Sequence, residues 1–375
     1  MTSKRKMSIL CVVGARPNFM KIAPIMRAFS GDDSCVKATL LHTGQHYDQS
    51  MKQSFFDQLS IPEPDIDLGV GGGTHAQQTA EIMLKFEPVL DELSPDAVLV
   101  VGDVNSTVAC ALVASKKGIR IIHVESGLRS YDRLMPEEIN RVLTDQLSDL
   151  LFTTEREAEE NLQREAVDLK NVHFVGNVMI DTLLYNVDRA VPAAQSLIET
   201  SSDQDFGVVT FHRPSNVDDP KILSRLIAVL IEISRSLPLV FPVHPRTEAS
   251  LRKNSLWTLL QDSNIELMAP LGYLELLGLM KQAKVVLTDS GGLQEETTAL
   301  GVPCITIRES TERPITITEG TNVLVGTDSA KILSAFDEVM ENGGKPGRQP
   351  EYWDGNAAMR ILDVIASYRD RWGIQ

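Results

Sequence analysis

Residues 123–141 read His-Val-Glu-Ser-Gly-Leu-Arg-Ser-Tyr-Asp-Arg-Leu-Met-Pro-Glu-Glu-Ile-Asn-Arg, and they decide the fold expected of this chain. The short run Ile119–Ile122 before them predicts a buried strand. Because side chains alternate along a strand, we expect His123 and Glu125 on one face at its carboxyl end. A glycine-containing loop and a polar, helix-like segment follow, so the stretch predicts a strand–loop–helix unit.

The predicted helix begins with acidic residues. Pro136 suits a first helical position, and Glu137 and Glu138 fall in the first turn, where the helix dipole favours carboxylates. Glu137 and Arg141 are four residues apart and would point the same way. On these residues alone, an ordinary surface ion pair and a core histidine remain as good an interpretation as a functional site.

The same pattern recurs along the chain: an apolar run, then charged or glycine-rich residues, then a helical segment. Asn105 or Ser106 is expected to cap the helix that follows one such run. The runs, each with the polar residues after it, are Met7–Val13 with Arg16 and Lys21, Ala97–Val101 with Asp103, Phe206–Phe211 with His212, Val285–Leu287 with Ser290, Gly291 and Gly292, and Pro303–Ile307 with Arg313.

Strands that alternate with helices predict an α/β fold with parallel sheets and right-handed crossovers. Two such series are separated by a polar passage at residues 190–205. We therefore expect two Rossmann-like, doubly wound domains that face each other across a cleft. The first would comprise residues 1–185, with the helix at 356–375 packing back on it, and the second residues 186–355.

Composition excludes several classes of partner. The formal net charge of −15 argues against nucleic acids and anionic membranes. No apolar run approaches the ~18 residues of a membrane span, and the basic amino terminus does not resemble a signal peptide. The four cysteines are scattered without metal-binding or paired spacing, which predicts buried thiols in a reducing compartment and a cytoplasmic protein.

The residues at the strand ends indicate a chemistry. The Ser290-Gly291-Gly292 helix start offers free backbone N–H groups, and five residues could help it to hold a diphosphate: Arg16, Lys21, His212, Arg213 and Arg313. Carboxylates that can move protons are supplied by Asp103, Glu125, Glu137 and Glu138. No Gly-x-Gly-x-x-Gly motif supports NAD binding. Together these groups suit a nucleotide-sugar enzyme.

An ordered set of motifs over most of the chain resembles the non-hydrolysing UDP-N-acetylglucosamine 2-epimerases. The motifs are Gly-Ala-Arg-Pro at 14–17 with Lys21, Gly-Gln-His at 44–46, Gly-Asp at 102–103, His-Val-Glu-Ser-Gly-Leu-Arg at 123–129, Pro-Glu-Glu-x-Asn-Arg at 136–141, Gly-Asn-x-x-Ile-Asp at 176–181, His-Arg at 212–213, Asp-Ser-Gly-Gly-x-Gln-Glu-Glu at 289–296 and Thr-Glu-Arg-Pro at 311–314. This resemblance implies the two-domain architecture of one large glycosyltransferase class, the GT-B type.

The resemblance also implies an activity and a set of roles. The enzyme would invert C2 of a UDP-sugar without NAD or an obligatory metal, by anti elimination of UDP and its re-addition, and it would be a homodimer. The catalytic group would be Asp103, Glu125, Glu137 and His212. Substrate would be held by Arg16, Lys21, Arg141, Leu271, Tyr273, Ser290, Gly291, Gly292, Glu296 and Arg313. Gln45, His46 and His244 fall where bacterial members bind a second, activating substrate molecule.

Two departures from the family pattern concern the sugar. Pro214-Ser215-Asn216 follows His-Arg, and Ile315 follows Thr-Glu-Arg-Pro, where many members carry Glu. A UDP-2,3-diacetamido-glucuronate is therefore an alternative substrate for the same chemistry. Rival functions are a glycosyltransferase of the same fold, a hydrolysing relative that releases UDP, and a nucleotide-sugar sensor. A zinc hydrolase built on His123 and Glu125 would lack a third ligand.

Overall fold

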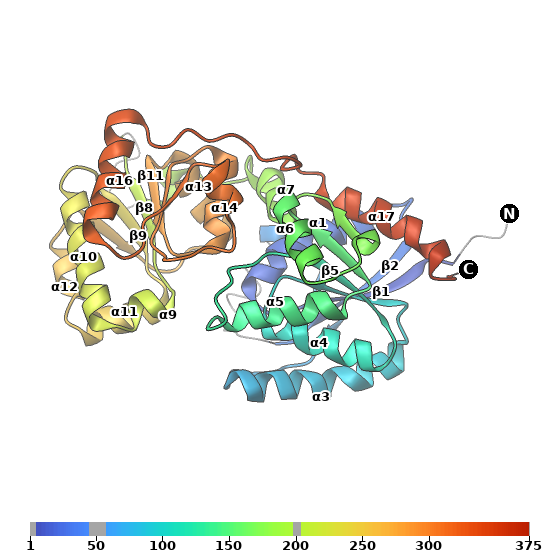
Figure 1. Cartoon of the computed structure of the whole chain (residues 1–375). Coiled ribbons are helices and arrows are strands. Elements are labelled where there is room, and N and C mark those ends of the chain that lie inside the picture. The colour runs from blue at the N-terminus through green and yellow to red at the C-terminus, as the bar shows by residue number, and fades with distance from the viewer. Residues whose placement is uncertain (1–4, 45–57, 198–203, 375) are drawn as a thin grey trace. The chain divides into compact units, whose positions relative to one another are not determined.

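The computed structural model describes residues 5–44, 58–197 and 204–374. The chain forms two compact units, one of residues 1–185 and 351–375, the other of residues 186–350. Each is a parallel sheet covered by helices (Figure 1). The predicted α/β fold class, with helices alternating with the strands of two parallel sheets, is confirmed. No helix within the described ranges is long and apolar enough to cross a bilayer.

The first unit is built on a seven-stranded sheet of order β3-β2-β1-β4-β5-β6-β7, with all neighbouring strands parallel. Two of its central strands, Met7–Val13 and Ala97–Val101, are apolar runs interrupted only by Ser8, as expected of strands that are buried on both faces. The strands are β1 (Met7–Val13), β2 (Val36–His42), β3 (Ile66–Asp67), β4 (Ala97–Val101), β5 (Arg120–Ser126), β6 (Leu150–Thr153) and β7 (Val172–Phe174).

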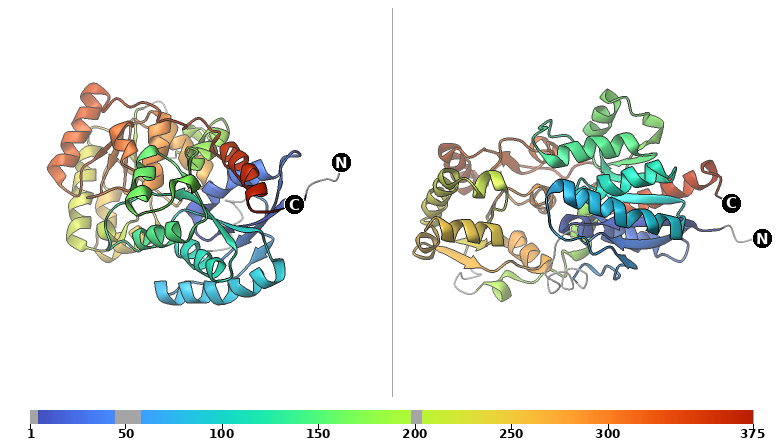
Figure 2. Two further views of the ribbon diagram at one scale, coloured as in Figure 1. Left: turned by 45° about the vertical axis from the view of Figure 1, so that its right-hand side comes forward. Right: turned by 90° about the horizontal axis from the view of Figure 1, so that it is seen from below.

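Helices cover both faces of this sheet. The helices are α1 (Arg16–Phe29), α3 (His75–Leu93), α4 (Asn105–Lys116), α5 (Pro136–Leu147), α6 (Arg156–Arg164), α7 (Val178–Asn186) and α17 (Ala357–Arg371), with a short 3-10 turn at Leu169–Asn171. Helices α3, α4 and α5 lie side by side on one face (Figure 2), and α1 packs with α17 on the other (Figure 1). Right-handed crossovers require this arrangement, because the chain moves outward from β1 in opposite directions.

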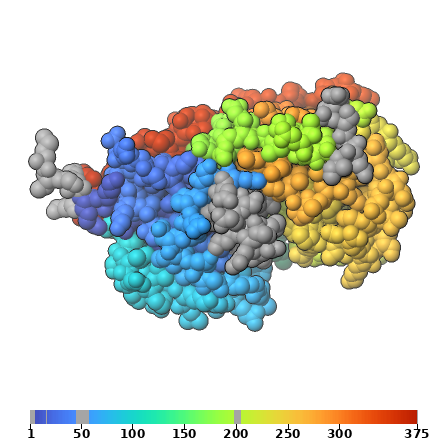
Figure 3. Space-filling view, turned by 180° about the vertical axis from the view of Figure 1, so that it is seen from behind, coloured from blue at the N-terminus to red at the C-terminus, as the bar shows by residue number. Residues whose placement is uncertain are grey.

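The carboxyl-terminal helix α17 belongs to the first unit. Its N-cap residue, Asn356, makes no capping hydrogen bond through its side chain. Instead the carboxylate of Asp181, on α7, accepts hydrogen bonds from the backbone N–H groups of Ala357 at 3.1 Å and Ala358 at 2.8 Å. In Figure 3 the red surface of this last segment lies against the blue surface of the amino-terminal part. The carboxylate of Asp181, far away in sequence, thus accepts hydrogen bonds from backbone N–H groups that have no partner within the helix.

The second unit is built on a six-stranded sheet of order β10-β9-β8-β11-β12-β13, again all parallel. Its strands are β8 (Gly207–Thr210), β9 (Leu239–Pro242), β10 (Ile265–Met268), β11 (Val285–Thr288), β12 (Cys304–Thr306) and β13 (Asn322–Leu324). Its helices are α8 (Ala193–Ser196), α9 (Pro214–Val217), α10 (Pro220–Ser234), α11 (Pro245–Lys253), α12 (Trp257–Gln261), α13 (Tyr273–Gln282), α14 (Gly291–Leu300), α15 (Ile315–Thr318) and α16 (Ser329–Asn342).

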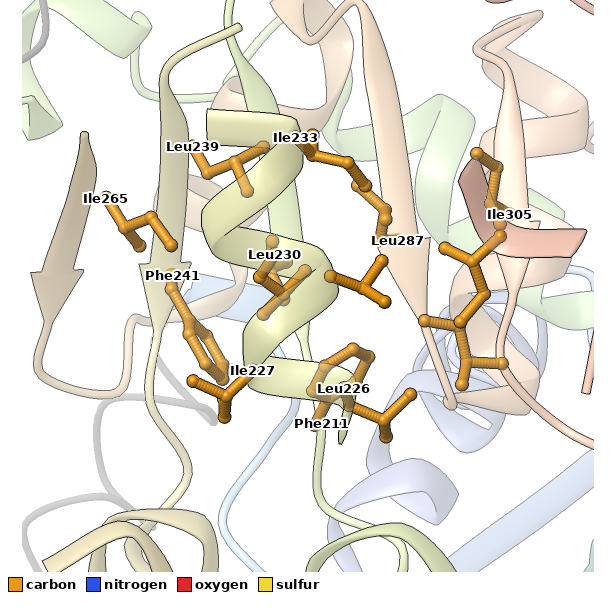
Figure 4. Close-up of a cluster of buried hydrophobic side chains, with 14 of the residues drawn as sticks. Phe211, Leu226, Ile227, Leu230, Ile233, Leu239, Phe241, Ile265, Leu287 and Ile305 are labelled. Carbon is orange, nitrogen blue, oxygen red and sulfur yellow. The ribbon is translucent and has the colours of Figure 1, made fainter. Parts of the chain in front are cut away.

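The core of the second unit lies between α10 and the sheet (Figure 4). It includes Phe211, Leu226, Ile227, Leu230, Ile233, Leu239, Phe241, Ile265, Leu287 and Ile305. The rings of Phe211 and Phe241 meet edge to face, with centroids 5.9 Å apart, a favourable aromatic geometry. Because the strands themselves are apolar, polar side chains gather where the strands end.

Candidate functional site

In both units the polar side chains singled out by the sequence lie at the carboxyl ends of the parallel strands. This is the edge at which open α/β sheets bind their ligands. In the first unit the strands concerned are β1, β4 and β5, which are neighbours in the sheet. In the second they are β8, β11 and β12, also neighbours.

At the first edge, Lys21 and Glu125 form a buried ion pair. The Lys21 Nζ atom donates to Glu125 Oε1 at 2.5 Å, and both side chains are almost fully buried. Helix α1, which carries Lys21, is held at the strand ends by Asn18, whose Nδ2 donates to the carbonyl oxygen of Val101 at 2.9 Å. Burying both charges costs solvation that only a close, well-oriented pair can offset. The pair therefore fixes the position of the Glu125 carboxylate.

The prediction that His123 and Glu125 share one face of the strand is wrong. The register between β5 and β6 shifts at Glu125, which is therefore an extra residue in the strand, and its φ is +69°. A β-bulge of this kind redirects a side chain. Glu125 contacts Lys21 on α1, whereas His123 contacts Asp145 on α5, and these two helices cover opposite faces of the sheet (Figure 1). A left-handed, non-glycine residue costs about 1–3 kcal/mol and is typical of functional sites.

Asp103 follows β4 and is held by Arg141. The Arg141 Nε and Nη2 atoms donate to Asp103 Oδ2 at 2.9 and 2.6 Å. Arg141 Nη1 donates to Glu138 Oε2 at 2.7 Å, so the buried guanidinium joins both carboxylates. Asn140 Nδ2 donates to the backbone oxygen of Asp103 at 2.9 Å. Arg141, expected to bind substrate, therefore holds a carboxylate expected to be catalytic.

Glu137 and Glu138 are adjacent in sequence but differ in surroundings. Glu138 is buried and accepts hydrogen bonds from the backbone N–H groups of Ser130 and Tyr131, both at 2.9 Å, as well as from Arg141. Burial would raise the pKa of Glu138, but these hydrogen bonds hold it below its usual value. Glu137 is half-buried, and its carboxylate has no hydrogen-bond or ion-pair partner among the described residues. Only Glu137 of the two is left available to a substrate.

A second buried network lies behind this edge. His123 Nδ1 is 2.7 Å from Asp145 Oδ1, and His123 Nε2 is 2.9 Å from the backbone oxygen of Gly102. Asp145 Oδ2 accepts from the backbone N–H of Gly127 at 3.1 Å and from Arg129 Nη2 at 2.7 Å. Burial would raise the pKa of Asp145, but His123 and then Arg129 hold it below its usual value. The network links the residues just before Asp103 and just after Glu125.

Three predicted residues of the first unit lie partly or wholly outside the described structure. Arg16 is the first residue of α1, at the carboxyl end of β1, and the position of its side chain is not described. Gln45 and His46, the expected activator-site residues, lie outside the described residues.

At the second edge, His212 is held by Asp289. His212 Nδ1 lies 2.9 Å from Asp289 Oδ1, and the backbone N–H groups of His212 and Arg213 donate to the same carboxylate. Asp289 is fully buried, which would raise its pKa, but His212 and these N–H groups hold it below its usual value. The His212 side chain is 42% exposed. A buried carboxylate that orients a half-exposed imidazole is the arrangement of a histidine acid or base.

Helix α14 begins beside His212 with Ser290 as its N-cap residue, and Gly291 and Gly292 are its first two residues. The Ser290 side chain makes no capping hydrogen bond. The first N–H groups of a helix have no partner within the helix, and the helix dipole favours a negative charge there. This helix start therefore retains the character of an anion site.

A cluster of buried charges adjoins the helix start. Glu312 lies between Arg308, at 2.7 Å, Arg313, at 3.1 Å, and Arg213, at 3.8 Å. Arg313 Nε is also 3.0 Å from Glu295 Oε1. Three guanidinium groups against two carboxylates leave one positive charge in excess, which favours an anionic ligand.

Gly291 is required at the helix start by the same cluster. A Cβ atom at this position would lie 2.7 Å from Glu312 Oε1 and 3.6 Å from the Arg313 guanidinium carbon. Glycine thus lets the predicted residues Gly291 and Arg313 approach each other.

Of the remaining predicted residues, Leu271, Tyr273 and Glu296 lie at or near the start of α13, whereas His244 directly precedes α11. Leu271 is half-buried in the loop before that helix, and Tyr273 is its first residue. Burial, and after it the neighbouring Glu296 carboxylate, raise the pKa of Tyr273. The structure thus brings Tyr273 and Glu296 together. The His244 Nδ1 atom accepts from the backbone N–H of Arg246 and so caps α11, and the His244 ring lies 5.9 Å from the His212 ring.

Three residues that shape these edges were not among the predicted site residues: Asp145, Asp289 and Glu312. Asp289 and Glu312 stand within quoted motifs, directly before Ser-Gly-Gly and directly before Arg313. An acidic residue beside an expected anion site was the available signal. Asp145 gives no local signal, because its partners His123, Gly127 and Arg129 lie 22, 18 and 16 residues earlier in the chain.

The chain was compared with known proteins. A family model described as UDP-N-acetylglucosamine 2-epimerase matches residues 30–366. A UDP-N-acetylglucosamine 2-epimerase of Methanocaldococcus jannaschii is 40% identical over 365 residues, covering 96% of this chain and 99% of the relative. A UDP-2,3-diacetamido-2,3-dideoxy-D-glucuronate 2-epimerase of Pseudomonas aeruginosa is 40% identical over 367 residues, with the same two coverages.

A solved structure gives the same result for the fold. The Methanocaldococcus jannaschii UDP-GlcNAc 2-epimerase in complex with UDP-GlcNAc and UDP matches with a TM-score of 0.88 at 38% identity, covering 96% of this chain and 100% of that chain. The family model spans most of the chain, and the relatives match over nearly their full length. This chain therefore belongs to the UDP-N-acetylglucosamine 2-epimerase family.

Proposed function

We propose that this chain interconverts UDP-N-acetylglucosamine and UDP-N-acetylmannosamine without hydrolysis. The observation that carries the proposal is the pairing of two carboxylates with buried cations at one sheet edge, Asp103 with Arg141 and Glu125 with Lys21. Fixed carboxylates of this kind can remove and return a proton at carbon. The half-buried Glu137 adds a third carboxylate.

The reaction balances without a redox cofactor. The bond between C1 and the UDP oxygen breaks, a carboxylate takes the C2 proton, and the products are a 2-acetamidoglucal and UDP. Developing positive charge at C1 makes the C2 proton acidic enough for a carboxylate. UDP then adds back to C1, and a proton is delivered to the opposite face of C2. We assign Asp103, Glu125, Glu137 and His212 to these proton transfers.

We assign the UDP moiety to residues of the second unit. The start of α14 at Ser290, Gly291 and Gly292, with Arg313, suits a diphosphate, because backbone N–H groups and cations stabilise a departing anion. Glu296 would accept from the ribose hydroxyls, and the backbone from Leu271 to Tyr273 would contact the uracil. Arg16 and Lys21 would contribute further positive charge from the start of α1.

Proton NMR in deuterated water tests the reaction. With UDP-N-acetylglucosamine as substrate, we expect deuterium at C2, the appearance of UDP-N-acetylmannosamine, and no stoichiometric free UDP. The Glu137→Gln variant is the inactive control. Free UDP that accumulates at the rate of turnover would identify a hydrolase instead, and turnover that requires an added acceptor would identify a glycosyltransferase.

A second candidate substrate follows from the Pseudomonas aeruginosa relative. It is as similar to this chain as the Methanocaldococcus jannaschii relative, and its name specifies a diacetamido-glucuronate as the sugar. If UDP-N-acetylglucosamine remains unlabelled, the same experiment with UDP-2,3-diacetamido-glucuronate decides whether only the sugar differs. The chemistry at C2 would be unchanged.

Three further properties belong to this proposal. We expect a cytoplasmic homodimer, and exposed apolar side chains at Leu134, Ile139 and Leu143 support an association surface on α5. We also expect a second substrate molecule to activate the enzyme through Gln45, His46 and His244. A strictly hyperbolic dependence of rate on substrate concentration would contradict that activation.

A further inference from the structure

His123 is a fully buried side chain whose two ring nitrogens both have a close partner. Its exposure is 0%, its Nδ1 is 2.7 Å from Asp145 Oδ1, and its Nε2 is 2.9 Å from the Gly102 backbone oxygen. The reaction proposed above assigns no role to His123. Its surroundings nevertheless hold both ring nitrogens in a fixed position.

Both partners of the His123 ring can only accept hydrogen bonds. A backbone carbonyl oxygen has lone pairs and no proton. Asp145 is engaged as a carboxylate, because it also accepts from the Gly127 N–H and from Arg129. A neutral imidazole has one N–H group, so one of its nitrogens would turn a lone pair toward an oxygen. At a fully buried side chain that mismatch is costly.

We propose that His123 is held as an imidazolium cation and is a positioning residue for the catalytic carboxylates. Both hydrogen bonds are then satisfied, and the imidazolium forms an ion pair with Asp145. The functional part of this inference rests on the proposed epimerase reaction, whereas the charge state of His123 does not.

The contacts of His123 explain what it positions. The backbone N–H of Gly102 donates to the Val124 oxygen at 3.0 Å, and the Gly102 oxygen faces His123 Nε2. Two residues of β5, His123 and Val124, therefore hold the backbone oxygen and the backbone N–H of Gly102, the residue directly before Asp103. Gly102 has a φ of +66°, so this turn adopts a backbone conformation open mainly to glycine.

The other nitrogen of His123 extends the brace to α5 and to the loop after Glu125. Asp145 belongs to α5, the helix that also carries Glu137 and Arg141, and it binds the Gly127 N–H two residues beyond Glu125. Arg129 ties Asp145 to Glu165 on the far side, with two contacts of 2.8 and 2.6 Å to that carboxylate. One buried cation thus joins three segments that carry proposed catalytic groups.

A cation is also what the electrostatics of this edge favour. Asp103, Glu125, Glu137 and Glu138 would repel one another if they were gathered without nearby positive charge. Lys21 and Arg141 pair with three of these carboxylates. The imidazolium offsets the charge of Asp145, so that the brace adds no further negative charge.

Nitrogen-15 NMR of histidine-labelled protein tests the charge state. The His123→Gln variant lacks one imidazole signal and thereby assigns it. We expect both His123 nitrogens to resonate as protonated nitrogens at neutral pH. A His123 signal with one unprotonated nitrogen at neutral pH overturns the proposal. If His123→Gln does not fold, the Asp145→Asn variant makes the assignment through the shift of the same signal.

Kinetics tests the positioning role with two variants of the network. Asp145→Asn allows the ring to become neutral, because an amide can donate to Nδ1; we expect kcat to fall by about tenfold to a hundredfold with little change in KM. Glu165→Gln, which touches Arg129 but not His123, should keep kcat within about twofold. A wild-type kcat in Asp145→Asn, or an equal loss in Glu165→Gln, contradicts the role. If the wild type exchanges no C2 proton, the proposed reaction fails, while the NMR result still decides the charge of His123.

Discussion

Among single residues, Glu137 and Glu138 allow the same substitution to be compared at two neighbouring positions with different surroundings. Replacing Glu137 with Gln removes a carboxylate that has no partner among the described residues, so the fold should be kept. We expect kcat to fall by about 10²–10⁴-fold, the usual contribution of a general acid or base, with Tm unchanged. The same change at Glu138 removes a buried negative charge that pairs with Arg141, and it turns one of two oxygens that accept from backbone N–H groups into an N–H donor.

For Glu138→Gln we therefore expect a loss of about 2–4 kcal/mol in the free energy of unfolding, measured by urea denaturation. Activity per folded molecule should fall as well, because Arg141 also holds Asp103. If Glu138→Gln leaves stability unchanged, the structural role of Glu138 is contradicted. If Glu137→Gln destabilises the fold, the role of Glu137 as an accessible carboxylate is contradicted.

The pH dependence of Glu138 gives a separate prediction. Its pKa in the folded state lies below the ordinary value of 4.5, so its contribution to stability is complete above that value. The contribution is lost as the pH falls through the lower, folded-state pKa. The difference in unfolding free energy between wild type and Glu138→Gln should be largest at about pH 7 and should shrink steadily in acid below the ordinary pKa. A difference that grows on acidification would contradict this sign.

Sequence reasoning located single residues well where a strand end determines their place. Asp103, Glu125 and His212 lie at carboxyl ends of strands, and period two with apolar runs was enough to put them there. The sequence did not predict the direction of the Glu125 side chain. A bulge adds one extra residue to the strand, and the alternation of apolar and polar residues does not reveal it. Sequence reasoning also could not pair His123 with Asp145, which are 22 residues apart and meet only after β5 and α5 pack.

At the scale of elements, α17 depends on a carboxylate from another helix. Asp181→Ala leaves two backbone N–H groups at the start of α17 without their acceptor. We expect a loss of about 1–2 kcal/mol in unfolding free energy, together with faster proteolysis near residues 351–371. Asp363→Ala, at an exposed position of the same helix, is the control and should stay within about 0.5 kcal/mol of wild type. Equal stability of the two variants would remove the capping role of Asp181.

The alternation of strands and helices was predictable where a strand is a nearly unbroken apolar run, as in β1, β4 and β11. The N-cap residue of α4 was not predicted correctly. The prediction that Asn105 or Ser106 caps this helix is wrong: Val104 is the N-cap residue and makes no side-chain bond. Asn105 Nδ2 instead donates to Gln78 Oε1 at 2.7 Å, and Ser106 Oγ pairs with Thr43 Oγ1 at 2.7 Å. Asn105 and Ser106 form hydrogen bonds to residues far away in sequence instead of capping the helix, and a local sequence pattern does not reveal such partners.

At the scale of the whole molecule, the charge balance has to be reconciled with an anionic substrate. The chain carries a formal charge of −15, which opposes the approach of a nucleoside diphosphate. The cluster of Arg213, Arg308 and Arg313 around Glu312 provides a local excess of positive charge beside the start of α14. We therefore expect substrate recognition to depend on these arginines, of which Arg308 and Arg313 are buried, and not on the overall field.

The association surface proposed on α5 gives the last prediction. Ile139 and Leu143 are four residues apart on this helix, so they share a face, and they are 42% and 49% exposed; Leu134, just before the helix, is 92% exposed. Leu143→Glu should convert a homodimer into a monomer, measured by light scattering after size-exclusion chromatography. Burial of a charge at an apolar interface is unfavourable, whereas the same charge on a monomer surface costs about 0.5 kcal/mol or less. Leu259→Glu, at an exposed position of α12, is the matched control and should leave the dimer intact. A Leu143→Glu protein that remains dimeric would place the interface elsewhere, and a monomeric wild type would remove it.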